Sequence, residues 1–173
     1  LNMGLITVKP MLYVCNLSED NIFDGNAFSK AVSAKAKSEN CGYTFVSAQI
    51  EQELSLLDEK ERNEYLLAIG LEEPTLNRLI RSGYNLLDLI SFFTVGPKEA
   101  RGWTATNGVK APQAAGKIHT DFEKGFIKAE TIAYSDYISF DGENGAKEAG
   151  KMRVEGSNYI VKDGDIFHFR FNV

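Results

Sequence analysis

Two short apolar runs separated by a helical segment constrain the first half of this chain more than any other feature. The runs occupy residues 10–15 and 43–46. The segment between them, at residues 27–38, places four apolar residues roughly on one helical face: Phe28, Ala31, Val32 and Ala36. A strand, a helix and a strand within about 37 residues predict a β–α–β unit with parallel strands. Because a continuous apolar run suits a strand covered on both faces, we expect the first strand to be buried in an α/β sheet.

Residues 50–89 are helical in character. Asp58 and Glu61 have the spacing of a capping pair that opens one helix, and Gly70 is placed to close it. Pro74 marks the start of a further helix. That helix carries an apolar stripe at helical spacing, formed by Leu76, Leu79, Ile80, Tyr84 and Leu87. The stripe fits either a core-facing surface or a partner-binding helix, and the core-facing interpretation is favoured.

Near residue 90 the pattern changes from helical spacing to alternation and turn residues, so we expect a domain boundary at residues 88–91. The expected elements after it are strands at 91–95, 101–106 and 126–133 and a helix from Pro112 to about His119. The triplet at 163–165 is Asp-Gly-Asp, which indicates a hairpin between strands at 158–162 and 166–173.

The last strand alternates along its length, which predicts one buried and one open face. Its apolar face is formed by Phe167, Phe169, Phe171 and Val173, and its other face by His168, Arg170 and Asn172. A small mixed sheet crossed by one helix is a β-grasp, ubiquitin-like pattern. The open-face residues His168 and Arg170, together with Lys162, are candidates for contacts with RNA or protein, against the alternative of ordinary exposed strand residues.

The net charge of −5 arises in the first half, where 13 acidic residues among residues 1–90 outnumber 8 basic ones. Neither half has the basic excess of a protein held to nucleic acid mainly through phosphates, so any RNA contact is expected to be local. Two cysteines, Cys15 and Cys41, indicate a reducing compartment rather than a disulfide scaffold. No apolar run approaches the ~20 residues of a membrane span, and we expect a cytoplasmic protein without membrane contact.

Polar residues follow both apolar runs, at the edge where open α/β sheets bind ligands. Asn16, Leu17 and Glu19 come after the first run, where P-loop GTPases have Asn-Lys-x-Asp with an Asp that accepts from guanine. Adenine lacks the paired donors of guanine, while the apolar Leu17 is suited to pack on a ring. Ser47 and Ala48 follow the second run, where such proteins have a loop whose backbone faces the exocyclic group of the base. The two loops together predict half of a site for a nucleotide base.

Several stretches of the sequence resemble the YchF/Ola1-type ATPases of the Obg branch of P-loop GTPases. The similarity is most specific at residues 111–126 and 163–173, and it extends over essentially the whole chain. The stretches that carry it are Lys9-Pro10, Asn16-Leu17-Ser18-Glu19, Ser47-Ala48, Leu71-Glu72-Glu73-Pro74, the run from Ala111 to Phe126 and the ending from Asp163 to Val173.

The resemblance implies an α/β remnant of a P-loop nucleotide-binding domain at residues 1–88 and an α+β TGS domain of β-grasp type at 89–173. It also implies that the parent protein binds ATP or GTP, prefers ATP, uses Mg²⁺, and associates with the large ribosomal subunit or RNA. The base-binding residues carried over are Asn16, Leu17, Glu19, Ser47 and Ala48. One departure is Gln49, where related proteins often have Lys. The opening Leu1-Asn2-Met3-Gly4 has no initiator Met, so we expect the chain to be part of a longer protein.

Catalytic residues are not expected in this chain. The sequence contains no G-x-x-x-x-G-K-[ST] motif to hold phosphates and position Mg²⁺, so we expect it to be inactive in hydrolysis by itself. His119 and His168 have no cysteine partner at metal-ligand spacing, which argues against a zinc site, and a small enzyme built on either histidine lacks a nucleophile and base. The alternative to the ATPase interpretation is a β-grasp adaptor that works without nucleotide. An incomplete parallel sheet also predicts homo-dimer formation, or disorder, at residues 10–46.

Overall fold

The computed structural model describes residues 5–172. Contacts within the chain divide it into two compact units, which meet in the sequence between Leu87 and Asp88. No helix in the described residues is long and apolar enough to cross a lipid bilayer. Cys15 and Cys41 are both free thiols.

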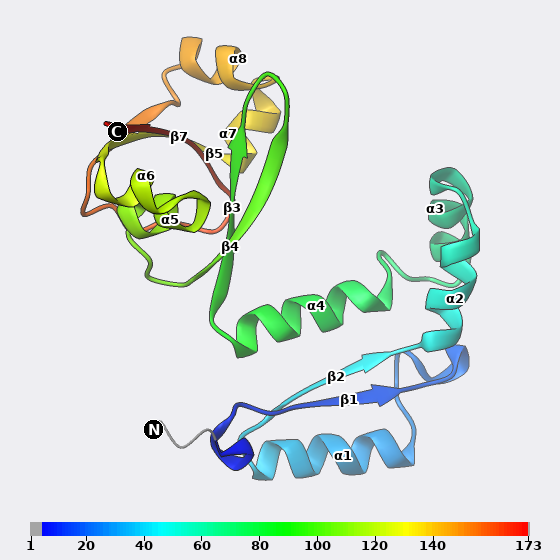
Figure 1. Cartoon of the computed structure of the whole chain (residues 1–173). Helices are drawn as coiled ribbons and strands as arrows, with labels where there is room; N and C mark the ends of the chain where they lie inside the picture. The colour runs from blue at the N-terminus through cyan, green and yellow to red at the C-terminus, as the bar shows by residue number, and fades with distance from the viewer. Residues whose placement is uncertain (1–4, 173) are drawn as a thin grey trace. The chain divides into compact units, whose positions relative to one another are not determined.

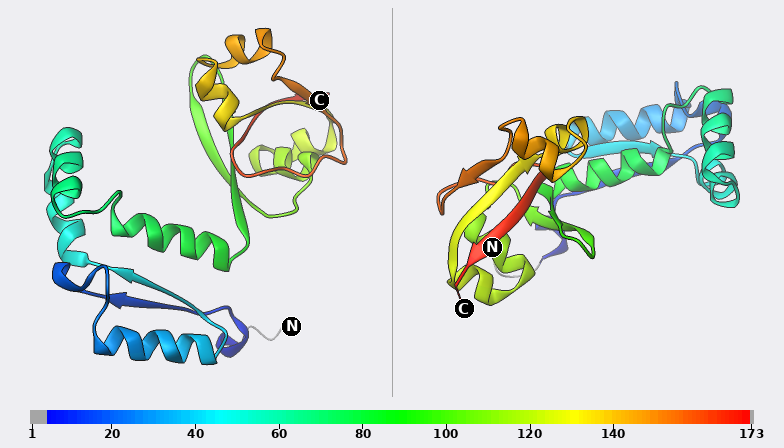
Figure 2. Two further views of the ribbon diagram at one scale, coloured as in Figure 1. Left: turned by 180° about the vertical axis from the view of Figure 1, so that it is seen from behind. Right: turned by 90° about the horizontal axis from the view of Figure 1, so that it is seen from above.

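Unit 1, which ends at Leu87, is a two-stranded parallel sheet between helices. β1 (Leu12–Asn16) pairs with β2 (Gly42–Val46), and the register places Asn16 opposite Val46. α1 (Ala27–Ser38) lies along one face of the two strands and α4 (Thr75–Leu86) along the other, as the views in Figure 1 and Figure 2 show. The remaining elements of unit 1 are η1 (Ile6–Val8), η2 (Glu19–Asn21), α2 (Ala48–Leu56) and α3 (Glu59–Ala68).

The predicted β–α–β unit is confirmed, but the expectation that its first strand is buried is wrong. Val14, in the middle of β1, is 46% exposed, because a sheet of two strands leaves part of β1 uncovered. Of the apolar residues predicted on one face of α1, Ala36 is buried and Phe28 is 84% exposed. The error about β1 arises from treating an apolar strand as buried without knowing how wide the sheet is.

The helix boundaries of residues 48–86 follow the predicted signals. The Asp58 carboxylate accepts from the Glu61 N–H at 2.9 Å, and the Glu61 carboxylate accepts from the Asp58 N–H at 3.2 Å, which completes the capping box. Gly70 follows α3 with a φ of 75°, in the left-handed region that suits glycine.

The apolar stripe of α4 is not the core-facing surface that we expected. Leu76, Ile80 and Leu87 are 45%, 49% and 55% exposed, while Leu79 and Tyr84 are half-buried. The helix packs on only two strands, so only part of its apolar surface is covered.

Unit 2, which begins at Asp88, is a five-stranded mixed sheet in the order β4-β3-β7-β5-β6. Its central strand β7 is parallel to β3 and antiparallel to β5, so the last strand of the sequence lies in the middle of the sheet. The strands are β3 (Leu89–Val95), β4 (Ala100–Thr106), β5 (Phe126–Ala133), β6 (Arg153–Glu155) and β7 (Asp165–Phe171), and the helices are α5 (Ala111–Ile118), α6 (Thr120–Lys124), α7 (Tyr134–Ser139) and α8 (Glu143–Glu148).

The core of unit 2 lies between the sheet and α5, and aromatic rings fill it. Phe92 meets Phe167 edge to face, with the ring centroids 5.7 Å apart, and three alanines of α5 are fully buried beneath them. The predicted alternation of the last strand is confirmed, since Phe167 and Phe169 are buried while His168 and Arg170 are exposed. Val173, assigned to the same apolar face, lies outside the described residues.

The predicted hairpin around residues 163–165 is wrong. The turn exists, with the Asp165 N–H bonded to the Lys162 carbonyl at 3.1 Å, but residues 158–162 contain only an isolated bridge between Ile160 and Lys110. β7 pairs with β3 and β5 instead. The short elements α7, α8 and β6 were not predicted from the sequence, because an element of at most six residues shows little periodicity.

A buried carboxylate anchors the start of β7. Asp165 is 2% exposed, and its side chain accepts from the Tyr159 hydroxyl at 2.7 Å, the Lys162 N–H at 2.9 Å and the Arg153 guanidinium at 3.3 Å. Burial and the bond to Asp165 raise the pKa of Tyr159 to about 12. The network therefore fixes the loop of residues 156–164 to the central strand.

Replacing Tyr159 by Phe keeps the ring and removes the hydroxyl that donates to Asp165. We expect the free energy of unfolding at pH 7 to fall by about 1–3 kcal/mol, because a buried carboxylate loses a partner. Since the folded pKa of Tyr159 is raised, the wild-type stabilisation is present below about pH 10 and is lost as the pH approaches 12. Urea denaturation at pH 7 and pH 11 measures both effects. The control is Tyr134→Phe on an exposed ring, and an equal loss in that variant would contradict the assignment.

Candidate functional site

The carboxyl ends of β1 and β2 bring the two predicted loops together. The side-chain oxygen Oδ1 of Asn16 accepts from the Ala48 N–H at 2.9 Å, although 32 residues separate them. The Leu17 N–H donates to the Val46 carbonyl at 2.8 Å, which extends the strand pairing by one step. The parallel register of β1 and β2 places these residues at one edge of the sheet.

A chain of hydrogen bonds fixes the second loop, which contains Ser47 and Ala48, on its buried side. Ser47 and Thr75 are both fully buried, and the Ser47 N–H donates to Thr75 Oγ1 at 3.1 Å. The Thr75 hydroxyl donates to Glu51 Oε1 at 2.6 Å, and the same oxygen accepts from the Leu76 N–H at 2.9 Å. Ser47 also caps α2 by accepting from the Ile50 N–H at 3.4 Å. The loop is therefore tied to the amino-terminal ends of both α2 and α4.

Leu17 and Glu19 differ in their burial and in their contacts. Leu17 is 6% exposed and belongs to an apolar cluster with Ile22 and Ile50, so its side chain does not present the open surface that the sequence led us to expect. Glu19 is half-buried at the start of η2, and its negative charge is close enough to contribute to the raised pKa of Tyr65. The main cause of that shift, to about 12, is the bond from the Tyr65 hydroxyl to Glu53.

The chemistry of this edge suits a flat ring with donors and acceptors on its rim. Because Asn16 Oδ1 accepts from Ala48, the amide nitrogen Nδ2 of the same side chain remains a donor. The Glu19 carboxylate supplies an acceptor. Among the described residues no group of three or more His, Cys, Asp or Glu side chains is placed to hold a metal ion.

Thr75 and Glu51 are parts of this site that were not predicted from the sequence. Pro74 was identified only as a helix start, and Glu51 only as a residue of a helical segment. Thr75 follows Pro74 directly, and Thr is common at the start of a helix. Nothing in the sequence shows that its hydroxyl reaches the second loop.

The predicted partner-binding residues of unit 2 are all exposed, but they do not form one basic group. Arg170 is bound to Glu130, with Nη2 2.9 Å from a carboxylate oxygen, and this bond lowers the pKa of Glu130. His168 is opposite Glu130 on the neighbouring strand, and Lys162 lies in the loop before β7. His119 has a structural contact, since its Nδ1 accepts from the Asp121 N–H at 3.2 Å at the start of α6.

Comparisons with known proteins give one consistent result. Residues 89–172 match the family model YchF-GTPase_C, described as a protein of unknown function (DUF933). The chain is 53% identical over 99% of its length to the ribosome-binding ATPase YchF of Escherichia coli O157:H7, and covers 47% of that protein. It is 46% identical over 97% of its length to Obg-like ATPase 1 of Rattus norvegicus, and covers 43% of it. A solved structure of the Schizosaccharomyces pombe YchF GTPase matches with a TM-score of 0.80 and 36% identity, over 95% of this chain and 44% of that one.

The fold is therefore of the α/β class, with a mixed sheet and helices similar to those of a YchF GTPase. The chain belongs to the YchF family, and residues 89–172 are its YchF-GTPase_C domain. It spans about half the length of the curated relatives that it matches.

Removing the Thr75 hydroxyl tests whether it fixes the second loop. In Thr75→Val the buried Ser47 N–H loses its acceptor, so we expect the amide hydrogens of Ser47 and Ala48 to exchange faster and the unfolding free energy to fall by about 1–3 kcal/mol. Hydrogen exchange followed by NMR measures the first effect. Thr75→Ser retains a hydroxyl and should restore slow exchange. Ser55→Ala removes an exposed hydroxyl that bonds only to the Gln52 carbonyl and serves as the matched control.

Proposed function

We propose that residues 1–88 are the carboxyl-terminal part of a P-loop nucleotide-binding domain and that residues 89–173 are a TGS domain of β-grasp type. Two parallel strands between helices support the first assignment. For the second, the support is a mixed sheet in which the neighbouring strands β3 and β7 are parallel and the core is covered by α5. The names of the relatives, a ribosome-binding ATPase and an Obg-like ATPase, point in the same direction.

The bond between Asn16 and Ala48 carries the functional proposal. It joins the two loops into one surface, in which Asn16, Glu19 and Ala48 bind the base of ATP. Leu17 and Ser47, predicted as base contacts, are buried and hold the two loops from the core side. The Ala48 N–H is already committed to Asn16. In this proposal adenine donates from N6 to the Glu19 carboxylate and accepts at N7 from Asn16 Nδ2. Guanine also accepts at N7, so the support for ATP comes from the names of the relatives, both of which are ATPases.

The phosphates and Mg²⁺ are held by residues outside this chain in our proposal. When bound, they supply the scissile bond and the charge neutralisation that phosphoryl transfer requires. The sequence has no Walker-type motif, and the described residues contain no acidic cluster for a cation. The contribution of this chain is to bind and orient the base, and we expect it to hydrolyse no ATP by itself.

The Asn16→Ala substitution tests the base contacts. In a full-length YchF-type protein with this sequence, we expect ATP affinity to fall by about tenfold, because the donor to N7 and the bond that joins the loops are both lost. Isothermal titration with ATP and GTP measures the change. Asn63→Ala, on an exposed position of α3, is the control. Unchanged ATP affinity in Asn16→Ala would overturn the assignment of the site.

We further propose that unit 2 mediates association with the large ribosomal subunit or its RNA, in the cytoplasm. The names of the bacterial relatives, which are ribosome-binding ATPases, support an association with ribosomes. The exposed residues Lys162, His168 and Arg170 are the candidates for this contact. The alternative function is a nucleotide-independent adaptor, in which unit 2 binds its partner and the loops of unit 1 are irrelevant.

Co-sedimentation with ribosomes separates these functions. We expect the chain to pellet with ribosomes, more weakly after Lys162→Ala or at raised salt, because a local basic contact is screened. In the full-length protein, pelleting that depends on ATP supports the ATPase, and pelleting that does not depend on ATP supports the adaptor. No pelleting contradicts a ribosomal role.

Light scattering on the chain without ribosomes tests the homo-dimer expected from the incomplete sheet, in which the outer edge of β1 and the exposed Val14 would form the contact.

A further inference from the structure

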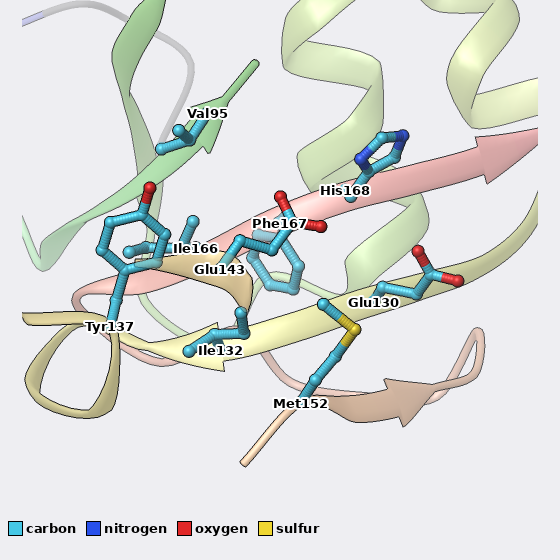
Figure 3. Close-up of a pocket in the computed structure, with 9 residues that line it drawn as sticks. All are labelled: Val95, Glu130, Ile132, Tyr137, Glu143, Met152, Ile166, Phe167 and His168. Carbon is cyan, nitrogen blue, oxygen red and sulfur yellow. The ribbon is translucent and has the colours of Figure 1, made fainter. Parts of the chain in front are cut away.

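The central strand of unit 2 has an edge that is only partly paired. β3 pairs with β7 at two positions, Phe93 with Ile166 and Thr94 with Phe167, and β3 ends one residue later at Val95. β7 continues for four residues beyond Phe167, to Phe171. Figure 3 shows the ribbon of β3 leading away from that of β7 beyond Val95. The second half of β7 therefore has a strand on its β5 side and none on its β3 side.

The backbone groups on the open side can be assigned. The Asn172 N–H donates to the Gly125 carbonyl at 2.9 Å, directly before β5, so the even-numbered residues of β7 point their backbone groups toward β5. Because these groups alternate along a strand, those of the odd-numbered residues Phe169 and Phe171 point toward the open side. They form a short row of donors and acceptors of the kind to which an extended peptide adds as a further strand.

A groove runs along this edge, and its walls are largely apolar. It has a volume of ≈ 300 Å³, and we call it the β7 groove. The β3–β4 hairpin lines one side and β7 the other, with α5 and α6 below. The residues that matter most are Val95, Glu99, Trp103, Phe122 and His168.

The β7 groove continues past Val95 and His168 into a second hollow of ≈ 490 Å³ beside α7 and α8. In Figure 3, Tyr137 and Glu143 lie at this end, around the first residues of β7. An extended chain laid along β7 would thus pass from the aromatic part of the groove to the hollow beside α8.

The charge around this path is acidic. Glu99, Asp141 and Glu143 line the two hollows, all three are exposed, and no ion pair involves them among the described residues. Two basic residues lie near this path. Arg170 is already bound to Glu130, and Arg101 lies over the ring of Trp103, 4.2 Å from its centroid. The carboxylates repel the phosphates of RNA and attract basic side chains.

We propose that the β7 groove binds an extended, Lys- or Arg-containing segment of a partner protein, which pairs with the backbone of Phe169 and Phe171 as an added strand. The backbone of β7 supplies affinity without regard to sequence. The apolar wall at Trp103 and Phe122 takes apolar side chains on one face of the added strand, and the carboxylates select basic residues. This inference does not depend on the nucleotide site of unit 1.

The probe is a six-residue peptide of alternating Lys and Val, acetylated and amidated, titrated into the whole chain labelled with ¹⁵N. We expect saturable shifts of the Phe169 and Phe171 amide signals. A peptide of alternating Glu and Val should bind more weakly, and so should the Lys peptide with Pro at a central position, because Pro lacks a donor. No saturable shift at Phe169 and Phe171, equal affinity for the Lys and Glu peptides, or the same shifts with an oligouridine RNA would each overturn the proposal.

A charge-neutralised variant tests the acidic rim without disturbing the core. Glu99→Gln combined with Glu143→Gln should weaken binding of the Lys peptide by about 2- to 30-fold, as expected for two exposed ion pairs. Glu123→Gln combined with Glu148→Gln removes the same charge from exposed positions of unit 2 outside the groove and should leave the affinity unchanged. An equal loss in both double variants would show a general charge effect and contradict a specific groove.

Discussion

Parallel strand pairing is the constraint on which the rest of this structure depends. Parallel strands cannot be joined by a tight turn, so a long connection must intervene before the second strand returns. In unit 1 that connection contains α1, and the pairing of β1 with β2 brings Asn16 next to Ala48. In unit 2 the connection from β3 to β7 contains nearly the whole unit. Both candidate binding surfaces lie where a parallel pair ends.

The Glu51 carboxylate helps to hold the second loop in place through the Thr75 hydroxyl. Glu51 accepts from both the Thr75 hydroxyl and the Leu76 N–H, so it caps α4 while it orients the hydroxyl that holds Ser47. Every donor in this chain of bonds has an acceptor, which matters because Ser47 and Thr75 are fully buried. The second loop is therefore held rigidly before any ligand arrives.

Elements with strong local signals could be predicted from the sequence, and those decided by tertiary contacts could not. The capping box at Asp58 and the alternation around Phe167 depend on spacing alone, and both are as expected. The hairpin before β7 was wrong because a turn signal does not identify the partner of a strand. The exposed stripe of α4 and the buried Leu17 were missed for a related reason, since the width of the sheet and the path of α3 decide which apolar residues are covered.

The central position of β7 has a consequence for how unit 2 folds. Phe167 and Phe169 supply much of the aromatic core, yet they belong to the last strand of the unit. Contacts between residues so far apart in sequence form late and slowly, because the loop between them must close first. During synthesis β3, β4 and β5 leave the ribosome before the strand that joins them exists. Unit 2 therefore reaches its folded state only after its final residues are available.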